Sequence, residues 1–257
     1  MPDLSDCLKG NLIMIKFFYK VIHKTRYLDE VDVRAYSSPG GRKKNEDAFL
    51  VADGLYAVCD GLGGHENGEV ASICAINTIK NHIGEERRND WLLTIIEDVN
   101  RRVFDLPVDA YSTIVIAFIW NGYFYYNNVG DSRIYYFREG RILAQSLDDT
   151  VCQKLVDQGK MDPKDIRIDI RRSYLLRVLG NDRSLSPGNQ YMPIAVQKGD
   201  AFLLCSDGLW EFILEEEMED DLIRTKNSKE WMNKILKRQN KYVHDQSDNY
   251  TIICGRL

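Results

Sequence analysis

The sequence predicts an α+β fold in which antiparallel β-sheet is covered by α-helices. Strand-like and helix-like segments occur in separate runs along the chain, whereas repeated βαβ units need them to alternate. Several apolar segments are joined by two-residue turns such as Asp53-Gly54 and Asn121-Gly122, which are typical of antiparallel hairpins. With 257 residues, of which 44% are hydrophobic, the chain is long enough for one large domain with a substantial core.

Strands are expected in apolar segments that end at glycine, proline, asparagine or aspartate. These segments are residues 31–37, 49–52, 55–59, 112–120, 123–128, 133–137, 141–145, 200–206 and 250–256. Only short turns separate the segments between residues 112 and 145, including one at Gly130-Asp131. This spacing predicts a four-stranded antiparallel meander.

Helices are expected where apolar residues recur every three or four positions. These stretches are residues 68–81, 91–104, 149–159, 215–224 and 228–239. Residues 160–173 differ from them because they are polar, contain Pro163 and show no clean period. We expect a mobile surface segment there.

Residues 1–28 are interpreted as an N-terminal extension, and residues 29–257 as the domain. Within the extension, residues 12–22 are apolar, but they are too few to span a bilayer and include Lys16 and Lys20. The acidic start and the lack of a small-residue cleavage site argue against a secretory signal. Two interpretations stay open: an interfacial amphipathic helix, or an additional element packed on the domain.

The composition excludes several classes of protein. The formal net charge is −5, from 34 basic and 39 acidic residues, which argues against a nucleic-acid partner held by a broad basic face. The six cysteines form no Cys-x-x-Cys pair and the four histidines are scattered, so a disulfide framework or a zinc site is not expected. We expect a cytoplasmic protein with no transmembrane segment, and a monomer.

The most informative stretch of the chain runs from Ala57 to Glu69. An apolar strand ends at Asp60, three of the next four residues are glycines, and an amphipathic helix follows. A carboxylate beside almost bare backbone allows a metal ion or a phosphate to approach closely. An ordinary strand–turn–helix connection explains this stretch equally well, so residues elsewhere must decide between the two interpretations.

Further carboxylates share the placement of Asp60. Four aspartates lie at or beside the end of an apolar strand next to a turn: Asp60, Asp131, Asp207 and Asp248. Asp47 lies just ahead of another strand. Each alone is explained as a turn residue, but converging carboxylates repel one another unless cations lie between them. Oxygen-only ligands indicate Mg²⁺ or Mn²⁺, and two such ions can aim a bridging hydroxide at phosphorus. Arg42 is either a bidentate phosphate ligand or a surface arginine.

Five motifs occur in one order along the chain. They are Arg42-x-x-Asn45-Glu46-Asp47, Asp60-Gly61-x-Gly63-Gly64-His65, Val129-Gly130-Asp131-Ser132-Arg133, Leu204-Cys205-Ser206-Asp207-Gly208-Leu209-Trp210 and Asp248-Asn249-x-Thr251. Together they resemble the type 2C metal-dependent protein phosphatases, in particular the compact bacterial forms. The resemblance implies a central β-sandwich of two antiparallel sheets flanked by α-helices, with metals in a cleft at one edge. It also implies hydrolysis of phosphoserine and phosphothreonine in protein substrates by metal-activated water, opposing a serine/threonine kinase.

The resemblance assigns roles by position. It implies a ligand set for two ions, Mn²⁺ or Mg²⁺, made of Asp47, Asp60, the Gly61 carbonyl, Asp207 and Asp248, with Glu46 acting directly or through water. Asp60 bridges both ions. Asp131 matches a carboxylate that helps to hold a third, weaker ion, and Arg42 matches the phosphate-binding arginine. Residues 160–173 match the flap beside the cleft.

The chain also departs from the family pattern. Leu62 stands where many members have histidine or methionine, and leucine cannot donate a proton to the leaving group. His65 is therefore a candidate donor, or it makes a structural hydrogen bond to its loop. Tyr111 replaces a glycine, and Asp149 and Asp169 differ near the flap. These departures leave two alternative functions open: a non-catalytic module that binds phosphoproteins, and a phosphatase for small phosphorylated metabolites.

Overall fold

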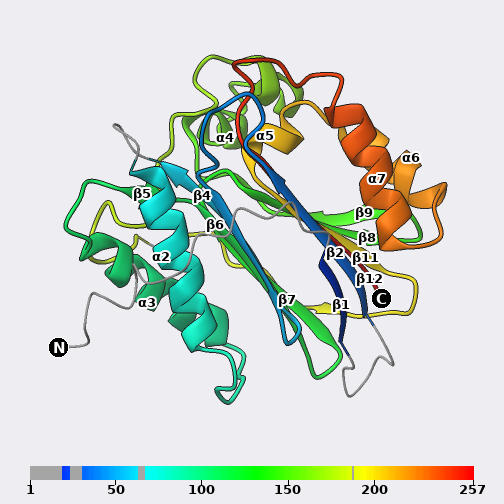
Figure 1. Ribbon diagram of the computed structural model, residues 1–257, viewed down its shortest axis with the longest axis horizontal. Coiled ribbons are helices and arrows are strands. Elements are labelled where there is room, and N and C mark those ends of the chain that lie inside the picture. Colours follow the sequence, from blue (N-terminus) through cyan, green and yellow to red (C-terminus); the bar gives the residue numbers. More distant parts are fainter. Residues whose placement is uncertain (1–18, 24–30, 63–66, 187) are drawn as a thin grey trace.

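The computed structural model describes residues 19–23, 31–62, 67–186 and 188–257. They form two six-stranded antiparallel sheets that pack face to face, with helices on the outer surfaces (Figure 1). The α+β class predicted from the sequence and the β-sandwich implied by the resemblance are both confirmed.

Each sheet combines strands from distant parts of the chain. The strand order of the first sheet is β1 (Tyr19–His23), β2 (Val31–Ser38), β12 (Tyr250–Arg256), β11 (Ala201–Cys205), β8 (Arg133–Arg138) and β9 (Arg141–Gln145). The order of the second sheet is β10 (Ile194–Ala195), β7 (Tyr123–Val129), β6 (Ile114–Trp120), β4 (Leu55–Leu62) and β3 (Asp47–Ala52), with β5 (Tyr111–Ser112) paired to the end of β4.

Two pairs of longer helices cover the sandwich. Helices α2 (Gly68–Asn81) and α3 (Trp91–Phe104) pack on the second sheet, and α6 (Glu215–Ile223) and α7 (Ser228–Gln239) pack on the first. Three shorter helical elements lie nearer the carboxylates: α4 (Val151–Asp157), the 3₁₀-helix η1 (Pro163–Ile168) and α5 (Asp207–Trp210).

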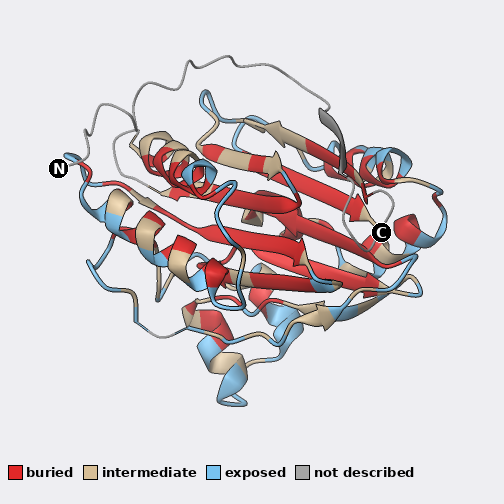
Figure 2. Cartoon of the chain, turned by 90° about the horizontal axis from the view of Figure 1, so that it is seen from below, coloured by how far each residue is buried: buried red, intermediate tan, exposed pale blue. Residues whose placement is uncertain are grey.

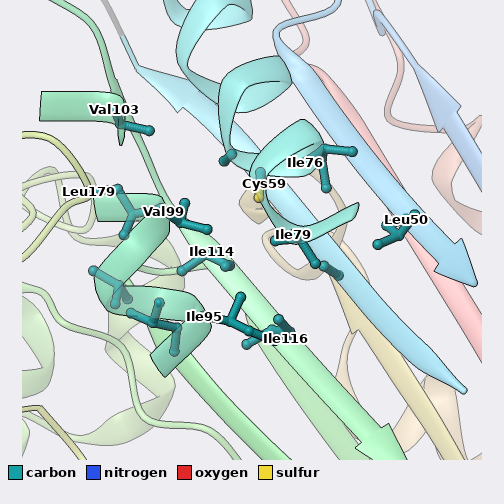
Figure 3. Close-up of a cluster of buried hydrophobic side chains, with 14 of the residues drawn as sticks. Leu50, Cys59, Ile76, Ile79, Ile95, Val99, Val103, Ile114, Ile116 and Leu179 are labelled. Carbon is teal, nitrogen blue, oxygen red and sulfur yellow. The ribbon is translucent and has the colours of Figure 1, made fainter. Parts of the chain in front are cut away.

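Three layers of apolar side chains hold these elements together, because burying apolar surface is the main driving force of folding. The inner layer lies between the sheets and includes Val33 and Leu204. Figure 3 shows the layer on the second sheet, where Ile79 of α2 and Val99 of α3 belong to one cluster with the strands. Trp231 of α7 lies in the third layer. The strands are accordingly buried along most of their length, whereas the outer helix faces are exposed (Figure 2).

The two-residue hairpins predicted from the sequence are present. Asp53-Gly54, Asn121-Gly122 and Glu139-Gly140 have positive φ at both residues, between 47° and 78°. This backbone conformation matches the twist of the flanking strands, and glycine or a short polar residue adopts it most easily. The local sequence therefore sets the register at the turn end of these three strand pairs, and the β8–β9 pair shifts register between Tyr136 and Phe137.

The four-stranded meander predicted over residues 112–145 is wrong. Strands β6 and β7 pair in the second sheet, but β8 and β9 pair in the first. The chain changes sheets at Gly130-Asp131, where Gly130 has φ +98° and a Cβ would collide with the Thr113 side chain. A short turn signal does not reveal whether the next strand stays in the same sheet.

Other differences concern short elements. Strand β1 lies within the extension predicted over residues 1–28 and pairs with β2, so residues 19–22 are not the amphipathic helix considered above. Residues 12–18 lie outside the described part. Elements η1, α5 and β10 have no counterpart among the predicted elements. In the described ranges, no helix has the length and apolar character needed to cross a membrane.

The sandwich brings several strand ends to one edge. Strand β3 begins and β4 reaches Asp60 at this edge, and Asp47 is paired directly with Asp60. In the other sheet, Cys205 at the end of β11 pairs with Arg133 at the start of β8 and with Ile252 of β12. The residues just beyond these strand ends therefore meet at one edge of the molecule.

Candidate metal centre

Five aspartates meet at this edge: Asp47, Asp60, Asp131, Asp207 and Asp248. The side chains of Asp60 and Asp207 lie close enough to interact directly. Asp60 is close enough to the other four for their charges to act on it. The two halves of the cluster differ in exposure, because Asp47 and Asp131 are buried whereas the Asp248 side chain is 47% exposed. The carboxylates singled out in the sequence thus converge from both sheets.

Glycines allow the segments that carry these aspartates to touch. A Cβ on Gly61 would overlap the carbonyl oxygen of Gly68, so only glycine lets α2 begin this close to β4. A Cβ on Gly208 would likewise overlap the carbonyl oxygen of Asn249. These two contacts bring the residues after β4 and β11 up against their neighbours across the site.

The backbone of Asp60 is fixed from the neighbouring strands. Its carbonyl oxygen accepts hydrogen bonds from the Thr113 N–H at 2.8 Å and the Ser112 hydroxyl at 3.0 Å. Its own N–H donates to the Thr113 hydroxyl at 3.1 Å, and that hydroxyl shares a second hydrogen bond with Ser132 Oγ, 2.7 Å away, in which either oxygen can be the donor. The direction of the Asp60 side chain is therefore set by paired backbone and not by a free loop.

A relay of hydroxyl groups holds Asp47. Its Oδ2 accepts hydrogen bonds from Ser206 and Thr251, each at 2.7 Å. Because the Thr251 hydroxyl has one proton, Ser37 must be the donor in its 2.7 Å bond to Thr251, and Asn45 donates to Ser37 in turn. Oδ1 of Asp47 is buried and has no partner among the described residues. One oxygen of this carboxylate is satisfied and the other lacks a donor or a cation.

Asn249 connects the loop that precedes β3 to the start of β12. Its Oδ1 accepts from the Glu46 N–H at 2.7 Å, and its Nδ2 donates to the carbonyl oxygens of Pro39 and Lys44, both at 2.9 Å. Asn249, Ser206 and Thr251 all stand in the motifs quoted above, but their functions were not predicted. Ser206 and Asn249 lie next to a candidate ligand in the sequence and Thr251 lies three residues after one, and that closeness was the available signal.

Asp131 is positioned by a layer of aromatic and charged side chains beneath it. Trp210 Nε1 donates to the Asp131 carbonyl oxygen at 2.8 Å, and the Arg133 guanidinium lies over the Trp210 ring, 3.5 Å from its centroid. Arg133 also makes two hydrogen bonds to Asp148, of 2.7 and 2.8 Å. Buried on both sides, this bidentate pair fixes the turn at which the chain changes sheets.

Burial and mutual repulsion make it unfavourable for all the carboxylates of the cluster to be ionised at the same time. Burial and neighbouring carboxylates raise the pKa of Asp47 to about 7 and that of Asp207 to about 6. The pKa values of Asp60 and Asp131 are raised well above the ordinary range for the same reasons. Burial, and then the charge of Asp248, also raises the pKa of Glu46. Without cations, some of these groups must bind protons at neutral pH.

The donors fit hard divalent cations. All are oxygens, the preferred ligands of Mg²⁺ and Mn²⁺, and the partnerless Oδ1 of Asp47 is a buried acceptor with nothing to accept from. Among the described residues, no three His, Cys, Asp or Glu side chains are already closed around one point in a coordinating arrangement. Mutual repulsion accounts for this, since the carboxylates have no common positive partner within the cluster.

Arg42 lies at the open side of the cluster. Its guanidinium donates to Asp248 Oδ2 at 3.2 Å, and 56% of its side chain is exposed. The turn before it packs on the Asp248 backbone, where a Cβ on Gly40 would collide with the Asp248 carbonyl oxygen and φ is +59°. A long, exposed guanidinium tethered at one point can swing to bind another anion.

The positions that depart from the family pattern have separate outcomes. His65 lies outside the described residues, so its predicted role stays untested. Leu62 pairs with Tyr111 between β4 and β5. Asp149 accepts hydrogen bonds from the Gly130 N–H at 3.1 Å and from Arg177 at 2.8 Å, and Asp169 accepts two from the Arg171 side chain. Both aspartates are therefore engaged within the protein.

Comparisons with known proteins agree with this geometry. The family model for protein phosphatase 2C matches residues 41–247. The chain is 28% identical over 227 residues to the serine/threonine phosphatase stp of Listeria welshimeri, a match covering 83% of this chain and 87% of that protein. It is 30% identical over 193 residues to the serine/threonine protein phosphatase PstP of Mycobacterium tuberculosis, covering 68% of this chain and 35% of that protein.

Solved structures share the same architecture. The serine/threonine phosphatase PstP/Ppp of Mycobacterium tuberculosis matches with a TM-score of 0.77 and 27% identity, covering 88% of this chain and 98% of that one. Stp1 of Staphylococcus aureus matches with a TM-score of 0.79 and 26% identity, covering 88% and 95%. The catalytic domain of PstP in complex with two manganese ions matches with a TM-score of 0.74 and 26% identity, covering 88% and 97%.

Proposed function

The chain belongs to the protein phosphatase 2C family of metal-dependent serine/threonine protein phosphatases, and from this premise we propose how its own residues perform the reaction. The observation that carries the proposal is the convergence of five carboxylates at one edge, four of them with raised pKa values, beside a mobile cationic side chain. The substrates are phosphoserine and phosphothreonine esters of proteins.

The ligand assignment follows the family pattern, with each residue taken at its matching position in this chain. Asp60 interacts with each of the other four aspartates, so it would be the ligand shared by two Mn²⁺ or Mg²⁺ ions. The other ligands are the Gly61 carbonyl, Asp207 and Asp248, with Asp47 and Glu46 on the opposite side and Asp131 toward a third ion. When bound, such ions lower the pKa of a coordinated water and offset the charge of the phosphate. The partnerless Oδ1 of Asp47 supports a cation on its side of the cluster.

The remaining tasks fall to other groups of the chain. Arg42 releases Asp248 and binds two phosphate oxygens, because a guanidinium matches a phosphate bidentately. The hydroxyl relay through Thr251 keeps Asp47 oriented while Oδ1 faces the cluster. Leu62 has no proton to give, so the leaving alkoxide takes its proton from water or from another side chain, for which His65 is the candidate. The exposure of Arg42 and Asp248 supports a protein substrate, since a phosphorylated loop can reach both from outside.

The test is phosphate release from a phosphothreonine peptide with Mn²⁺, measured for the native protein and for Asp60→Asn and Asp207→Asn. Both variants should lose activity, whereas Asp220→Asn, at an exposed aspartate paired with Arg224, should retain it. Equal activity in all four proteins would refute the assignment. Metal binding by calorimetry without turnover on any phosphopeptide would favour the binding module, and turnover of small phosphorylated metabolites alone would favour the third alternative.

We also propose the setting of the reaction. All five described cysteines are free and buried, which supports a reducing, cytoplasmic compartment. The net charge of −5 argues against nucleic acids as partners. We propose phosphoproteins as the partners, with a serine/threonine kinase as the opposing enzyme. We propose a monomer, with residues 29–257 as the catalytic domain. Residues 1–28 form an extension that contributes β1 to the first sheet.

A further inference from the structure

An aromatic groove lies far from the carboxylates, at the opposite end of the second sheet. It has a volume of about 660 Å³ and lies between the start of α3, the tip of the β6–β7 hairpin and residues 190–193. Five aromatic rings line it: Trp120, Tyr123, Tyr125, Tyr126 and Tyr191. Strand β7 runs from the hairpin tip toward Asp131, so at about 3.3 Å per residue the groove is roughly 20 Å from the metal centre. Figure 1 shows this hairpin pointing away from α5.

The walls of the groove are held in place without a ligand. Tyr191 stacks on Tyr126 with ring centroids 4.7 Å apart, and its hydroxyl donates to Asn128 and accepts from the Leu147 N–H, both at 2.9 Å. On the other side, the Tyr125 hydroxyl donates to Asn89 at 3.0 Å. A site with prepared walls loses little entropy when it binds.

The rings on one wall are splayed and not stacked. The Trp120 and Tyr125 centroids are 6.1 Å apart with planes at 50°, and those of Tyr123 and Tyr125 are 6.4 Å apart at 61°. Because Tyr125 is nearly buried and stacks on Phe118, the ring surface open to the groove belongs chiefly to Trp120 and Tyr123. Tyr123 is 44% exposed and Met192, on the opposite rim, is 84% exposed. This apolar surface is available to a ligand.

The chemistry of the lining points to an uncharged ligand that accepts hydrogen bonds. No lining residue is charged, although 28% of the chain is, and the polar lining side chains besides the tyrosines and the tryptophan are amides: Asn89, Asn121, Asn127 and Gln190. Trp120 Nε1 and the Tyr123 hydroxyl donate to no other described residue. The groove thus combines open ring faces with donors and has no charge to pair with an ionic partner.

We propose that this groove binds an uncharged, proline-rich peptide segment in the polyproline II conformation. Such a segment makes no internal hydrogen bonds, so its carbonyl oxygens are free to accept from tryptophan, tyrosine and amide donors, and its proline rings fit between splayed aromatic rings. A β-strand partner is less suitable, because the outer edge of β7 at Phe124 is already paired with Ile194 of β10. The site docks a protein partner while leaving the metal centre open.

Isothermal titration calorimetry on the full chain tests the proposal, with an uncharged, end-capped nonapeptide containing two Pro-x-x-Pro repeats as the probe. We expect saturable binding of one peptide per chain. Tyr123→Ala should weaken the affinity by about tenfold or more, as expected for a central aromatic contact. Tyr242→Ala is the matched control, because Tyr242 is 43% exposed and lies outside the groove.

A second groove variant keeps the test valid if Tyr123→Ala does not fold. Met192→Glu adds a negative charge at a rim position that is 84% exposed, so the fold should persist while binding weakens. Circular dichroism and phosphate release from a short, proline-free phosphopeptide should match the native protein for both variants. That readout also separates this proposal from the proposed phosphatase mechanism, since either can fail alone.

Several outcomes would overturn the proposal. These are no binding of the peptide, equal binding of a glycine–serine nonapeptide, and unchanged affinity in both groove variants. Tighter binding of an uncharged oligosaccharide than of the peptide would assign the rings to sugar recognition instead. A dimer in sedimentation analysis that Tyr123→Ala dissociates would identify a second copy of the chain as the occupant.

Discussion

The buried and exposed halves of the carboxylate cluster follow different rules. Asp47 is 9% exposed and its orientation depends on a relay of hydroxyl groups, whereas the Asp248 side chain is 47% exposed and accepts hydrogen bonds from the Asn249 N–H and from the exposed Arg42. In the buried half, charge is costly and geometry is fixed; in the exposed half, water screens the charge and the side chains can move. In the proposed mechanism, the buried half accordingly sets the metal geometry and the exposed half meets the substrate.

Removing a charge from the buried half should separate activity from stability most clearly. In Asp60→Asn we expect phosphate release with Mn²⁺ to fall by roughly 10³-fold, on the order of the loss when one preorganised charged group is removed. The metal-free variant should melt at the same or a higher temperature than the native protein, because one repelling carboxylate is gone. Calorimetry in EDTA and a phosphopeptide assay provide the two measurements.

If Asp60→Asn melted at a lower temperature than the native protein in EDTA, this would contradict the view that repulsion between the carboxylates destabilises the metal-free protein. Asp220→Asn serves as the control for both measurements, since its carboxylate is exposed and forms only a surface ion pair.

The pH dependence of the metal-free protein should show the same repulsion. Because the folded-state pKa values of Asp47 and Asp207 are raised to about 7 and about 6, the folded state holds protons that the unfolded state releases near pH 4. Stability from these groups is therefore present at low pH and is lost as pH rises through 6 and 7. We expect a higher melting temperature in EDTA at pH 5.5 than at pH 8.

The lower pH is chosen so that other acids do not interfere. Asp200 and Glu215 have lowered pKa values because of their arginine partners, so by pH 5.5 they are ionised in the folded state and largely so in the unfolded state. With Mn²⁺ the difference should shrink or reverse, since cations bind the ionised carboxylates of the folded protein. A metal-free melting temperature that rises toward pH 8 would show that the cluster does not hold protons.

The hydroxyl relay predicts an intermediate effect on stability. Thr251→Val removes one donor from Asp47 and the acceptor of Ser37, and should lower the free energy of unfolding by about 1–3 kcal/mol. Urea denaturation with Mn²⁺ measures this loss. Thr94→Val, on the outer side of α3, should change the free energy of unfolding much less. A loss no greater than that of Thr94→Val would mean that solvent replaces the relay.

The smallest effect is expected in the exposed half. Arg42→Lys keeps the charge but loses the bidentate fork, so kcat/KM for a phosphopeptide should fall by about tenfold while the melting temperature stays unchanged. Steady-state kinetics and thermal denaturation distinguish the two effects. If the melting temperature fell while activity stayed intact, the ion pair with Asp248 would stabilise the fold. Arg42 would then not be the residue that binds the substrate phosphate.

Local patterns predicted the elements that depend on neighbours in sequence. The period of apolar residues located α2, α3, α6 and α7, and Asp53-Gly54 located a hairpin because few residues tolerate positive φ. The carboxylates could be found because each lies at a strand end. Strand β1 and the change of sheet after Gly130 were missed, since neither has a local signal distinct from an ordinary strand or turn.

The sequence by itself determined the chemical types present at this site and the elements that carry them. Only the tertiary structure decided which groups became partners: the relay from Asn45 to Asp47, the close approach of Asp60 to Asp207, and an aromatic groove built from residues 89–93, 120–127 and 190–193. The reason is physical. Secondary structure follows from interactions within a few residues, whereas burial, repulsion and raised pKa values arise only when distant segments exclude water from the same place.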